Sequence, residues 1–445
     1  MGSIEKVSQF EDMTRIALTI SNGAAGFYLV YCIEENQFYI YKDGVWQTLF
    51  ELEIEKMILE HPEYTYVVKY TDDKRKQIVR VLKVYVQKRL EFFNAKGYLN
   101  FDIGEFDPVT LNFYDHNKDN YSTMRINYPY DHSATCPLWL STIEEILEKD
   151  NNKINMIQEF FGYCLTRDTS HRKSLLLLGE SNCGKSTILN VLRSMVGSKN
   201  CSSVVLKWLS NPQYTPMLMN KLVNIDSDVS SAAEDFEANF KVIASGEPIN
   251  CNQKFIKTFD FTPYCKLVMA ANVFPKIKDH SSAVYNKLLV IPCNRIFTEK
   301  EMNRNLSKEL DKELSGIFNW AVQGLRRLQQ RGMFEELDFI KEAVQELEDE
   351  NNPTNVFFEE HVEVEMLNNT FVEKMDLFNK YIAWCTAGNH FKLSRARFGS
   401  AVYKKFHKET PKDTKDLRTG KRIWRNIRYV DQKGEAQGEV IQWQE

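Results

Sequence analysis

A glycine-rich loop followed by lysine and serine is the clearest sign of chemistry in this sequence. Gly179, Gly184, Lys185 and Ser186 meet the pattern G-x-x-x-x-G-K-[ST] within LLLLGESNCGKST, residues 175–187. Glycines let backbone N–H groups wrap a phosphate, the N-terminus of the next helix points at the anion, and lysine reaches the β- and γ-phosphates. The sequence therefore predicts an ATP-binding, ATP-hydrolysing protein.

The predicted nucleotide site covers the whole loop and the first turn of the next helix. Ser186 is the expected Mg²⁺ ligand because its hydroxyl projects beside the β/γ oxygens. A chance Gly-Lys-Ser turn is the alternative, but the strand SLLLL before the loop and the amphipathic segment STILNVL after it supply the context that the motif requires. The predicted cofactor-binding residues are Gly179, Glu180, Ser181, Asn182, Cys183, Gly184, Lys185, Ser186 and Thr187.

Polar residues directly follow two apolar runs later in the sequence. Asp226 and Asp228 end KLVNIDSD, and a phosphate loop needs such a carboxylate on a neighbouring strand to hold Mg²⁺ and polarise water. We assign catalysis to Asp228 and a Mg²⁺-ligand role to Asp226, although either aspartate could begin a loop or cap the helix near Ser230. The predicted strand within KLVMAANVFP ends in Asn272, which could orient the attacking water or serve only as a turn residue.

The elements that must position these side chains alternate along residues 138–300. Apolar runs such as SLLLL, KLVNI and NKLLVIP alternate with helical segments such as STILNVLRSMV and FKVIAS, which predicts an α/β domain with a largely parallel sheet. A Pro/Asp/Asn-rich stretch at 126–137 and a break at Pro353 indicate boundaries. We expect an α+β N-terminal domain at 1–125 with a hairpin at 37–46, an ATPase domain at 130–350 and a small domain at 355–445.

Composition sets limits on function. A length of 445 residues predicts two or three domains, and 43% hydrophobic with 27% charged residues is typical of globular proteins. A net charge of −4 argues against nucleic-acid binding over the whole surface. The nine scattered cysteines without a C-x-x-C pair favour a reduced, cytoplasmic, metal-free setting, and without an apolar run of about 18 residues we expect no membrane segment.

Positive charge is concentrated near the C-terminus. Between Phe391 and Arg428 there are thirteen basic and three acidic residues. Helical DLFNKYIAWC and SRARFGSAVYKKF, followed by RIWRNIRYV after Thr419-Gly420, predict a winged helix whose second helix enters the major groove of duplex DNA. A solvated charged face is the alternative. The predicted contacts are Arg395, Arg397, Lys404, Lys405, Arg422 and Arg425.

Five blocks in order carry a family resemblance: GESNCGKST, KLVNIDSD, KVIASGEPINCNQKFIKTFDFTP, MAANVFPKIKDHSSAVYNKLLVIP and KELSGIFNWAVQGLRRL. They resemble the superfamily 3 replicative helicases, and more narrowly the primase–helicase type of phages, viruses and mobile genetic elements. The resemblance is strong over about 130–350 and loose over the first 125 residues. It implies an AAA+-like motor in a homo-hexameric ring, with ATP between subunits and single-stranded DNA in the channel, moving 3′ to 5′.

The resemblance also assigns roles by position. Lys185 and Ser186 fall on the Walker A motif, Asp226 and Asp228 on Walker B, and Asn272 on the sensor. The segment NQKFIKTFDF falls on a channel hairpin, where basic and aromatic side chains would track a sugar–phosphate backbone without reading its sequence; an ordinary surface turn is the alternative. The predicted hairpin contacts are Lys254, Phe255 and Lys257.

One position departs from the family. Near SSAVYNKLLVIP the family usually has an arginine that reaches into the neighbouring subunit's ATP site, whereas this chain has Asn286 and Lys287. Lysine supplies the charge but lacks the planar fork of donors, so Lys287 or the downstream Arg295 is the candidate.

Two other functions stay open at this level. An origin-binding initiator could use ATP only as an assembly switch, and a P-loop transferase would explain the loop but neither the hairpin nor the basic tail. We expect no primase activity, because Asp102, Glu105 and Asp107, in FDIGEFDP, are interpreted as loop residues and not as a metal site.

Overall fold

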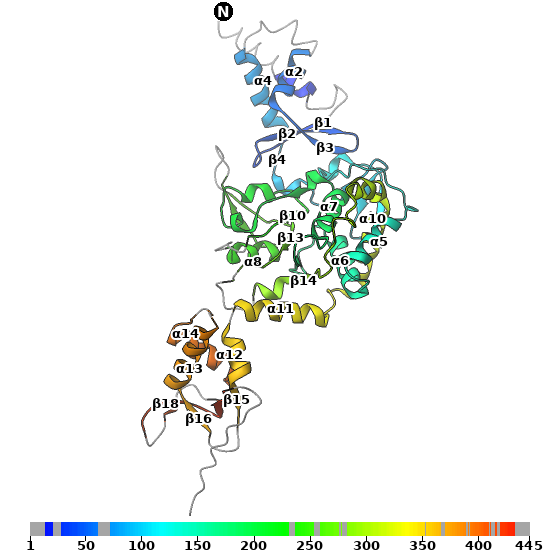
Figure 1. Ribbon diagram of the computed structural model, residues 1–445. Helices are drawn as coiled ribbons and strands as arrows, with labels where there is room; N and C mark the ends of the chain where they lie inside the picture. Colours follow the sequence, from blue (N-terminus) through cyan, green and yellow to red (C-terminus); the bar gives the residue numbers. More distant parts are fainter. Residues whose placement is uncertain are drawn as a thin grey trace, which may run out of the picture. The chain divides into compact units, whose positions relative to one another are not determined.

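The computed structural model forms two compact units, Met1–Ile340 and Lys341–Glu445, which are described separately (Figure 1). The structure describes residues 14–20, 28–60, 72–230, 236–252, 259–275, 277, 283–351, 353–365, 370–388, 390, 392–408, 410, 414–415 and 419–431. In these ranges no helix has both the length and the apolar character that crossing a bilayer requires.

A five-stranded sheet lies at the centre of the first unit, in the order β14-β8-β13-β10-β9, with every neighbouring pair parallel. The predicted α/β fold with a parallel central sheet is therefore confirmed. Its strands are buried and mostly apolar, as expected where helices cover both faces. Their bounds are β8 Ser174–Leu178, β9 Cys201–Ser202, β10 Val223–Asp226, β13 Lys266–Ala271 and β14 Leu288–Pro292.

The strand order decides which loops meet. Strand β13 is inserted between β8 and β10, although it follows both in the chain. Because all five strands are parallel, the segments that follow β8, β13 and β10 lie side by side at one edge of the sheet. In parallel α/β sheets this carboxyl edge is where ligands bind.

Two long helices, α6 and α10, lie beside each other in the first unit (Figure 1). They approach closely where Gly324 faces the Gln158 carbonyl, since a side-chain carbon at Gly324 would collide with it. The buried Glu159 of α6 binds Arg327 at 2.8 Å and also Arg331, both from α10. The helices of this unit after residue 130 are α5 Pro137–Ile146, α6 Asn151–Tyr163, α7 Lys185–Val196, α8 Glu237–Ser245, α9 Leu306–Leu310, α10 Leu314–Arg331 and α11 Asp338–Asn351, the last of which runs into the second unit.

The N-terminal part contains a mixed sheet in the order β3-β2-β1-β4. The hairpin predicted at 37–46 is present, with Asp43 and Gly44 both at positive φ, as a two-residue hairpin turn requires. Its strands pack against two amphipathic helices and the helical segment 14–20 through a shared apolar cluster. The bounds are β1 Tyr28–Cys32, β2 Gln37–Lys42, β3 Val45–Leu49, α2 Glu51–Glu60, α4 Asp72–Tyr85 and β4 Gln87–Lys88.

A second small sheet, β5 Leu99–Asn100, β6 Glu105–Asp107 and β7 Asn112–Tyr114, packs onto α10. The rings of Phe101 and Phe106 lie 4.9 and 5.1 Å from the ring of Phe318. The interpretation of Glu105 and Asp107 as loop residues is wrong: both lie in β6, where the buried Glu105 accepts a hydrogen bond from Asn120. A short antiparallel hairpin, β11 Ile249–Cys251 and β12 Phe259–Phe261, completes the first unit.

The second unit places three helices around one apolar cluster that includes Phe357, Tyr381 and Phe398. Both helices predicted for the basic region are present, and Ser394 caps the second by accepting from the Arg397 N–H. Strands β17 and β18 pair antiparallel on either side of Gly420. The bounds are α12 Pro353–His361, β15 Val362–Val364, β16 Phe371–Glu373, α13 Lys374–Ala387, α14 Arg395–Phe406, β17 Thr414–Lys415, β18 Arg422–Arg425 and β19 Ile427–Tyr429.

Candidate functional site

The glycine-rich loop connects the end of β8 directly to the start of α7. Gly184 caps that helix with a φ of 86°, a left-handed conformation that favours glycine. A side-chain carbon at Gly184 would also lie 2.6 Å from Ile146 on α5. The N-terminal N–H groups of α7 have no partner within the helix, so they are available to an anion.

Lys185 is 9% exposed and its ammonium lies under the loop. Its Nζ donates to the carbonyls of Gly179 and Glu180, each at 2.6 Å, and to Asn272 Oδ1 at 3.2 Å. Asn272 directly follows β13, and its Nδ2 donates to Ser181 Oγ at 3.4 Å. The structure thus brings together the lysine, the loop and the predicted sensor asparagine.

The two aspartates have different surroundings. Asp228 is exposed and lines the same cavity as Lys185 and Asn272. Asp226 is 5% exposed, and its carboxylate accepts the N–H of Leu206 at 2.7 Å and also the N–H of Asp228. Burial raises the pKa of Asp226. The accessible carboxylate is therefore that of Asp228, while that of Asp226 holds neighbouring backbone in place.

A cavity of about 970 Å³ opens over the loop at the carboxyl edge. Of the predicted cofactor-binding residues, those from Ser181 to Thr187 line it, while Gly179 and Glu180 contribute the carbonyls that hold Lys185. Sequence reasoning missed two other walls, which come from α5 and from the segment after β14. They contribute Leu138, Ser141, Thr142, Glu145, Ile146, Phe297, Glu301, Met302, Asn303, Arg304 and Leu306.

Lys287 and Arg295, the two candidates for the side chain that would reach into a neighbouring subunit's ATP site, lie at different places. Lys287 directly precedes β14, at the edge of the sheet away from the loop, and its Nζ donates to Ser245 Oγ at 2.5 Å. Burial and the nearby Arg172 lower its pKa. Arg295 instead forms ion pairs of 2.9 and 2.8 Å with Glu145 and Glu301, which line the chain's own cavity. Only Lys287 is thus directed away from that cavity.

The side chains at the cavity fit a magnesium–nucleotide complex. Over the described ranges, no three His, Cys, Asp or Glu side chains gather as a metal site. Mg²⁺ is commonly held by one or two protein oxygens together with substrate phosphates, so a preformed cluster is not required. Ser186 and Asp228 supply such oxygens at the cavity wall.

The predicted DNA contacts fall into two groups. Lys254, Phe255 and Lys257 lie outside the described residues, although β11 and β12 on either side of them pair as a hairpin. The six predicted contacts of the second unit are all exposed. Lys405 among them binds Glu359 at 3.3 Å.

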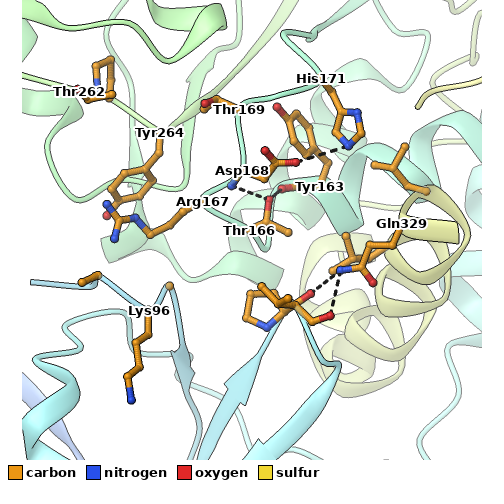
Figure 2. Close-up of a pocket in the computed structure, with 17 residues that line it drawn as sticks. Lys96, Tyr163, Thr166, Arg167, Asp168, Thr169, His171, Thr262, Tyr264 and Gln329 are labelled. Atoms are coloured by element: carbon orange, nitrogen blue, oxygen red, sulfur yellow. Dashed lines mark hydrogen bonds and ion pairs between the residues drawn. The ribbon is translucent and has the colours of Figure 1, made fainter. Parts of the chain in front are cut away.

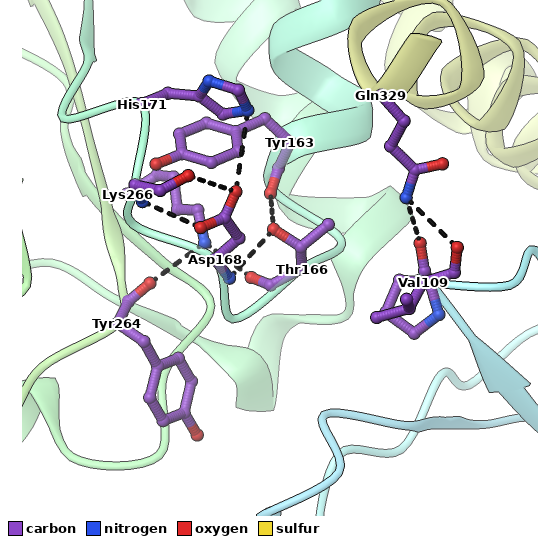
Figure 3. A network of polar contacts seen from close by, with 10 residues as sticks. Val109, Tyr163, Thr166, Asp168, His171, Tyr264, Lys266 and Gln329 are labelled. Carbon is purple, nitrogen blue, oxygen red and sulfur yellow. Dashed lines mark hydrogen bonds and ion pairs between the residues drawn. The ribbon is translucent and has the colours of Figure 1, made fainter. Parts of the chain in front are cut away.

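A second cavity, of about 520 Å³, lies toward the opposite edge of the sheet, and no predicted site residue lines it (Figure 2). Its walls come from the loop after α6, from α10, from the segment after β12 and from the N-terminal part. Beside it, Lys266 is 2% exposed and donates to the carbonyls of Thr166 and Tyr264 at 2.6 and 3.1 Å (Figure 3). Burial lowers the pKa of Lys266 to about 8.

Parts of the chain match two family models. Residues 177–286 match a family of unknown function, DUF5906, and residues 21–148 match the family described as D5 N terminal like. Over 221 residues the chain is 25% identical to a protein of Invertebrate iridescent virus 3 named "Putative helicase 121R". That alignment covers 45% of this chain and 23% of the viral protein, so the match spans less than a quarter of the relative's length.

Solved structures match almost the whole chain. The A form apo structure of the NrS-1 C-terminal region has a TM-score of 0.54 and 13% identity, over 93% of this chain and 98% of the other. A second apo structure of that region has a TM-score of 0.51 and 11% identity, over 94% and 98%. The chain is thus similar in sequence to a viral protein named as a helicase, and in fold to the NrS-1 C-terminal region.

Proposed function

We propose that the chain is the ATP-hydrolysing subunit of a replicative DNA helicase from a phage, virus or mobile genetic element. The observation that carries the proposal is the convergence of Lys185, Asn272 and Asp228 on one cavity at the carboxyl edge of the sheet. The viral relative and the fold shared with the NrS-1 region support it. The strand order, with β13 between β8 and β10, supports an AAA+-like P-loop domain.

The residues at the cavity divide the chemistry among them. The N–H groups around Gly184 and the Lys185 ammonium would bind the phosphates. Ser186 with an oxygen of Asp226 or Asp228 would hold Mg²⁺, and that ion would supply positive charge beside the transferring phosphoryl group. Asp228 accepts a proton from the attacking water, and Asn272 orients that water. The α5 wall and Phe297 exclude bulk solvent from one side of the cavity.

The proposed ring follows from the position of Lys287. Since this side chain lies at the edge away from its own cavity, it serves catalysis only if a second subunit presents its phosphates there. We therefore propose a homo-hexamer, with the β11–β12 hairpin and its Lys254 and Lys257 on single-stranded DNA. The second unit, as a winged helix with α14 and the β17–β18 wing, binds duplex DNA.

An origin-binding initiator is the second candidate. Lys287 is bound to Ser245 of its own chain and lacks the fork of an arginine, which favours slow hydrolysis and an assembly role for ATP.

A forked-duplex unwinding assay in ATP and Mg²⁺ tests both proposals, with wild type compared to Lys185→Ala and ATP turnover measured with and without single-stranded DNA. We expect unwinding and DNA-stimulated turnover by wild type only. Duplex binding and ring assembly without strand separation would favour the initiator. Turnover that is indifferent to single-stranded DNA would refute the helicase.

A further inference from the structure

Two cysteine side chains meet directly under the phosphate loop. Cys183 belongs to the loop itself, and Cys293 follows the last residue of β14. Strands β14 and β8 are paired, and the Cys293 N–H donates to the carbonyl of Leu178, the last residue before the loop, at 2.7 Å. The pairing of the central strands therefore fixes Cys293 beside the loop.

The Cys183 thiol lies against Cys293, and each cysteine is 1% exposed, while the Cys293 S–H points to the Ile291 carbonyl at 3.7 Å. Gly179 leaves the space for this contact, because a side-chain carbon there would collide with the Cys293 carbonyl and lie 3.1 Å from Cys183 Sγ. The Lys185 ammonium lies 3.3 Å from Cys183 Sγ. The sulfur of Cys183 thus contacts both a second thiol and the phosphate-binding cation.

We propose that Cys183 is a site of oxidative modification, and that its oxidation by a peroxide to a disulfide with Cys293 shuts the loop to nucleotide. The proposal rests on the ATP-binding function proposed above. Cys183 is among the residues that line the nucleotide cavity, so a small peroxide that enters this cavity comes next to the loop that carries the thiol.

The chemistry balances with hydrogen peroxide as the only added reactant. Cys183 sulfur attacks one peroxide oxygen, the O–O bond breaks, and a sulfenic acid and one water result. Cys293 sulfur then attacks the sulfenic sulfur, the S–S bond forms as the S–OH bond breaks, and a second water leaves with the Cys293 proton. Two thiols lose two electrons and two protons, and the peroxide is reduced to two waters.

The surroundings separate Cys183 from Cys201, another buried cysteine. The hydrogen bond from Cys293 and the Lys185 ammonium lower the pKa of Cys183, whereas burial raises the pKa of Cys201 to about 11. Thiolate character and access are what make a thiol reactive toward peroxide. Cys201 is therefore a matched, unreactive control.

A disulfide at this position would block the nucleotide site in two ways. The loop must wrap a phosphate, and the new bond would tie the middle of the loop to the end of β14. Lys185 would also lose the thiol that it contacts at 3.3 Å.

The test uses the full chain in its reduced state, then after hydrogen peroxide, then after dithiothreitol, with binding of a fluorescent ATP analogue as the readout. Tryptic peptides 174–185 and 288–295 contain one cysteine each, so their linkage with loss of two hydrogens identifies the bond by mass spectrometry. We expect the link and a fall in nucleotide affinity of about tenfold or more, both reversed by dithiothreitol.

Cysteine variants test whether the link requires Cys293. The nucleotide affinity of each oxidised variant is compared with that of the same variant in its reduced state. We expect Cys293→Ser to form no link and Cys201→Ser to form it as wild type does, with Cys293→Ala repeating the first result if the serine variant folds poorly. A wild-type chain that forms no link, or that forms it without losing affinity, overturns the proposal. A reduced chain that binds no ATP refutes the nucleotide function instead, whatever the thiols do.

Discussion

The two edges of the central sheet each hold a buried lysine, and the two lysines have different surroundings. At the carboxyl edge, Lys185 contacts the loop carbonyls, Asn272 and a thiol beside a cavity of about 970 Å³. At the amino edge, Lys266 donates to the carbonyls of Thr166 and Tyr264, and its ammonium lies 4.5 Å from the centroid of the Tyr163 ring. Both cations are satisfied by backbone oxygens, so burial and hydrogen bonding alone do not tell a ligand site from a structural one.

The difference lies in what surrounds each cation. The Lys185 edge presents a helix N-terminus whose first N–H groups have no partner within the helix, and the adjacent Asp228 is exposed to the same cavity. At the Lys266 edge several polar side chains bind one another or the backbone: His171 lies 3.6 Å from Asp168, and Gln329 donates to the Pro108 carbonyl at 2.8 Å (Figure 3). A site for an anion needs donors that the fold leaves open. At the carboxyl edge these are the first N–H groups of α7, whereas at the amino edge the buried Nε of Arg167, a residue of the second cavity, has no hydrogen-bond partner.

Substituting the two lysines in turn should give the largest difference in ATP turnover between the two edges. We expect Lys185→Ala to lower ATP turnover by about 10³-fold, because the phosphates lose a cation fixed beside them. Lys266→Met should leave turnover within about twofold of wild type, since its cation faces carbonyls of the protein itself. Steady-state ATPase assays, with circular dichroism to check folding, measure both. A large catalytic loss in the Lys266 variant would mean that the two edges are coupled.

The two aspartates test the carboxyl edge itself. We expect Asp228→Asn to lower kcat by about 10²-fold at saturating Mg²⁺ with little change in nucleotide affinity, because the water loses its proton acceptor. If Asp226 is a Mg²⁺ ligand, Asp226→Asn should instead raise the Mg²⁺ concentration needed for half-maximal turnover. It should also lower Tm, since its carboxylate holds the Leu206 N–H. Turnover measured across a Mg²⁺ titration separates the two roles, and equal effects would contradict the assignment.

Local patterns in the sequence were sufficient to predict the loop and the strands that carry it. The glycine spacing and the apolar runs before Gly179, Asp226 and Asn272 each depend on a few adjacent residues, and the parallel sheet follows from their alternation with helices. The rest depends on tertiary packing. Ile146 reaches the loop only because α5 packs against Gly184, and neither residue signals the other in the sequence.

The contrast between Asp226 and Asp228 was also beyond the sequence. Both follow one apolar run, and only the fold places the Leu206 N–H, 2.7 Å away, against the first of them. Cys183 and Cys293 are likewise far apart in the chain and meet because β14 pairs with β8. By contrast, Glu105 and Asp107 were misassigned because Gly104 and Pro108 signal a loop around what is a short buried strand.

Lys266, at the amino edge, should make the stability of the protein depend on pH. The pKa of Lys266 is lowered from 10.5 to about 8, so between these values the unfolded chain binds more protons and stability rises with pH. Lys266→Met removes that gain. We expect the free energy of unfolding of wild type, relative to the variant, to increase by about 1–3 kcal/mol between pH 8 and 10.5. Urea unfolding at both pH values measures the difference, and a constant difference would show that Lys266 titrates as an exposed lysine does.

The smallest expected effect comes from the second cavity, whose wall Gln329 joins to the N-terminal part (Figure 2). Gln329 Nε2 donates to the carbonyls of Pro108 and Val109 at 2.8 and 3.4 Å. Gln329→Ala removes this donor from one buried and one exposed residue, both of which line the cavity. We expect a loss of about 0.5–1.5 kcal/mol in stability and no change in nucleotide or DNA affinity. Thermal unfolding measures the first, and fluorescence anisotropy with labelled ATP and labelled single-stranded DNA measures the second. A severalfold change in either affinity would make this cavity a ligand site and end the distinction between the two edges.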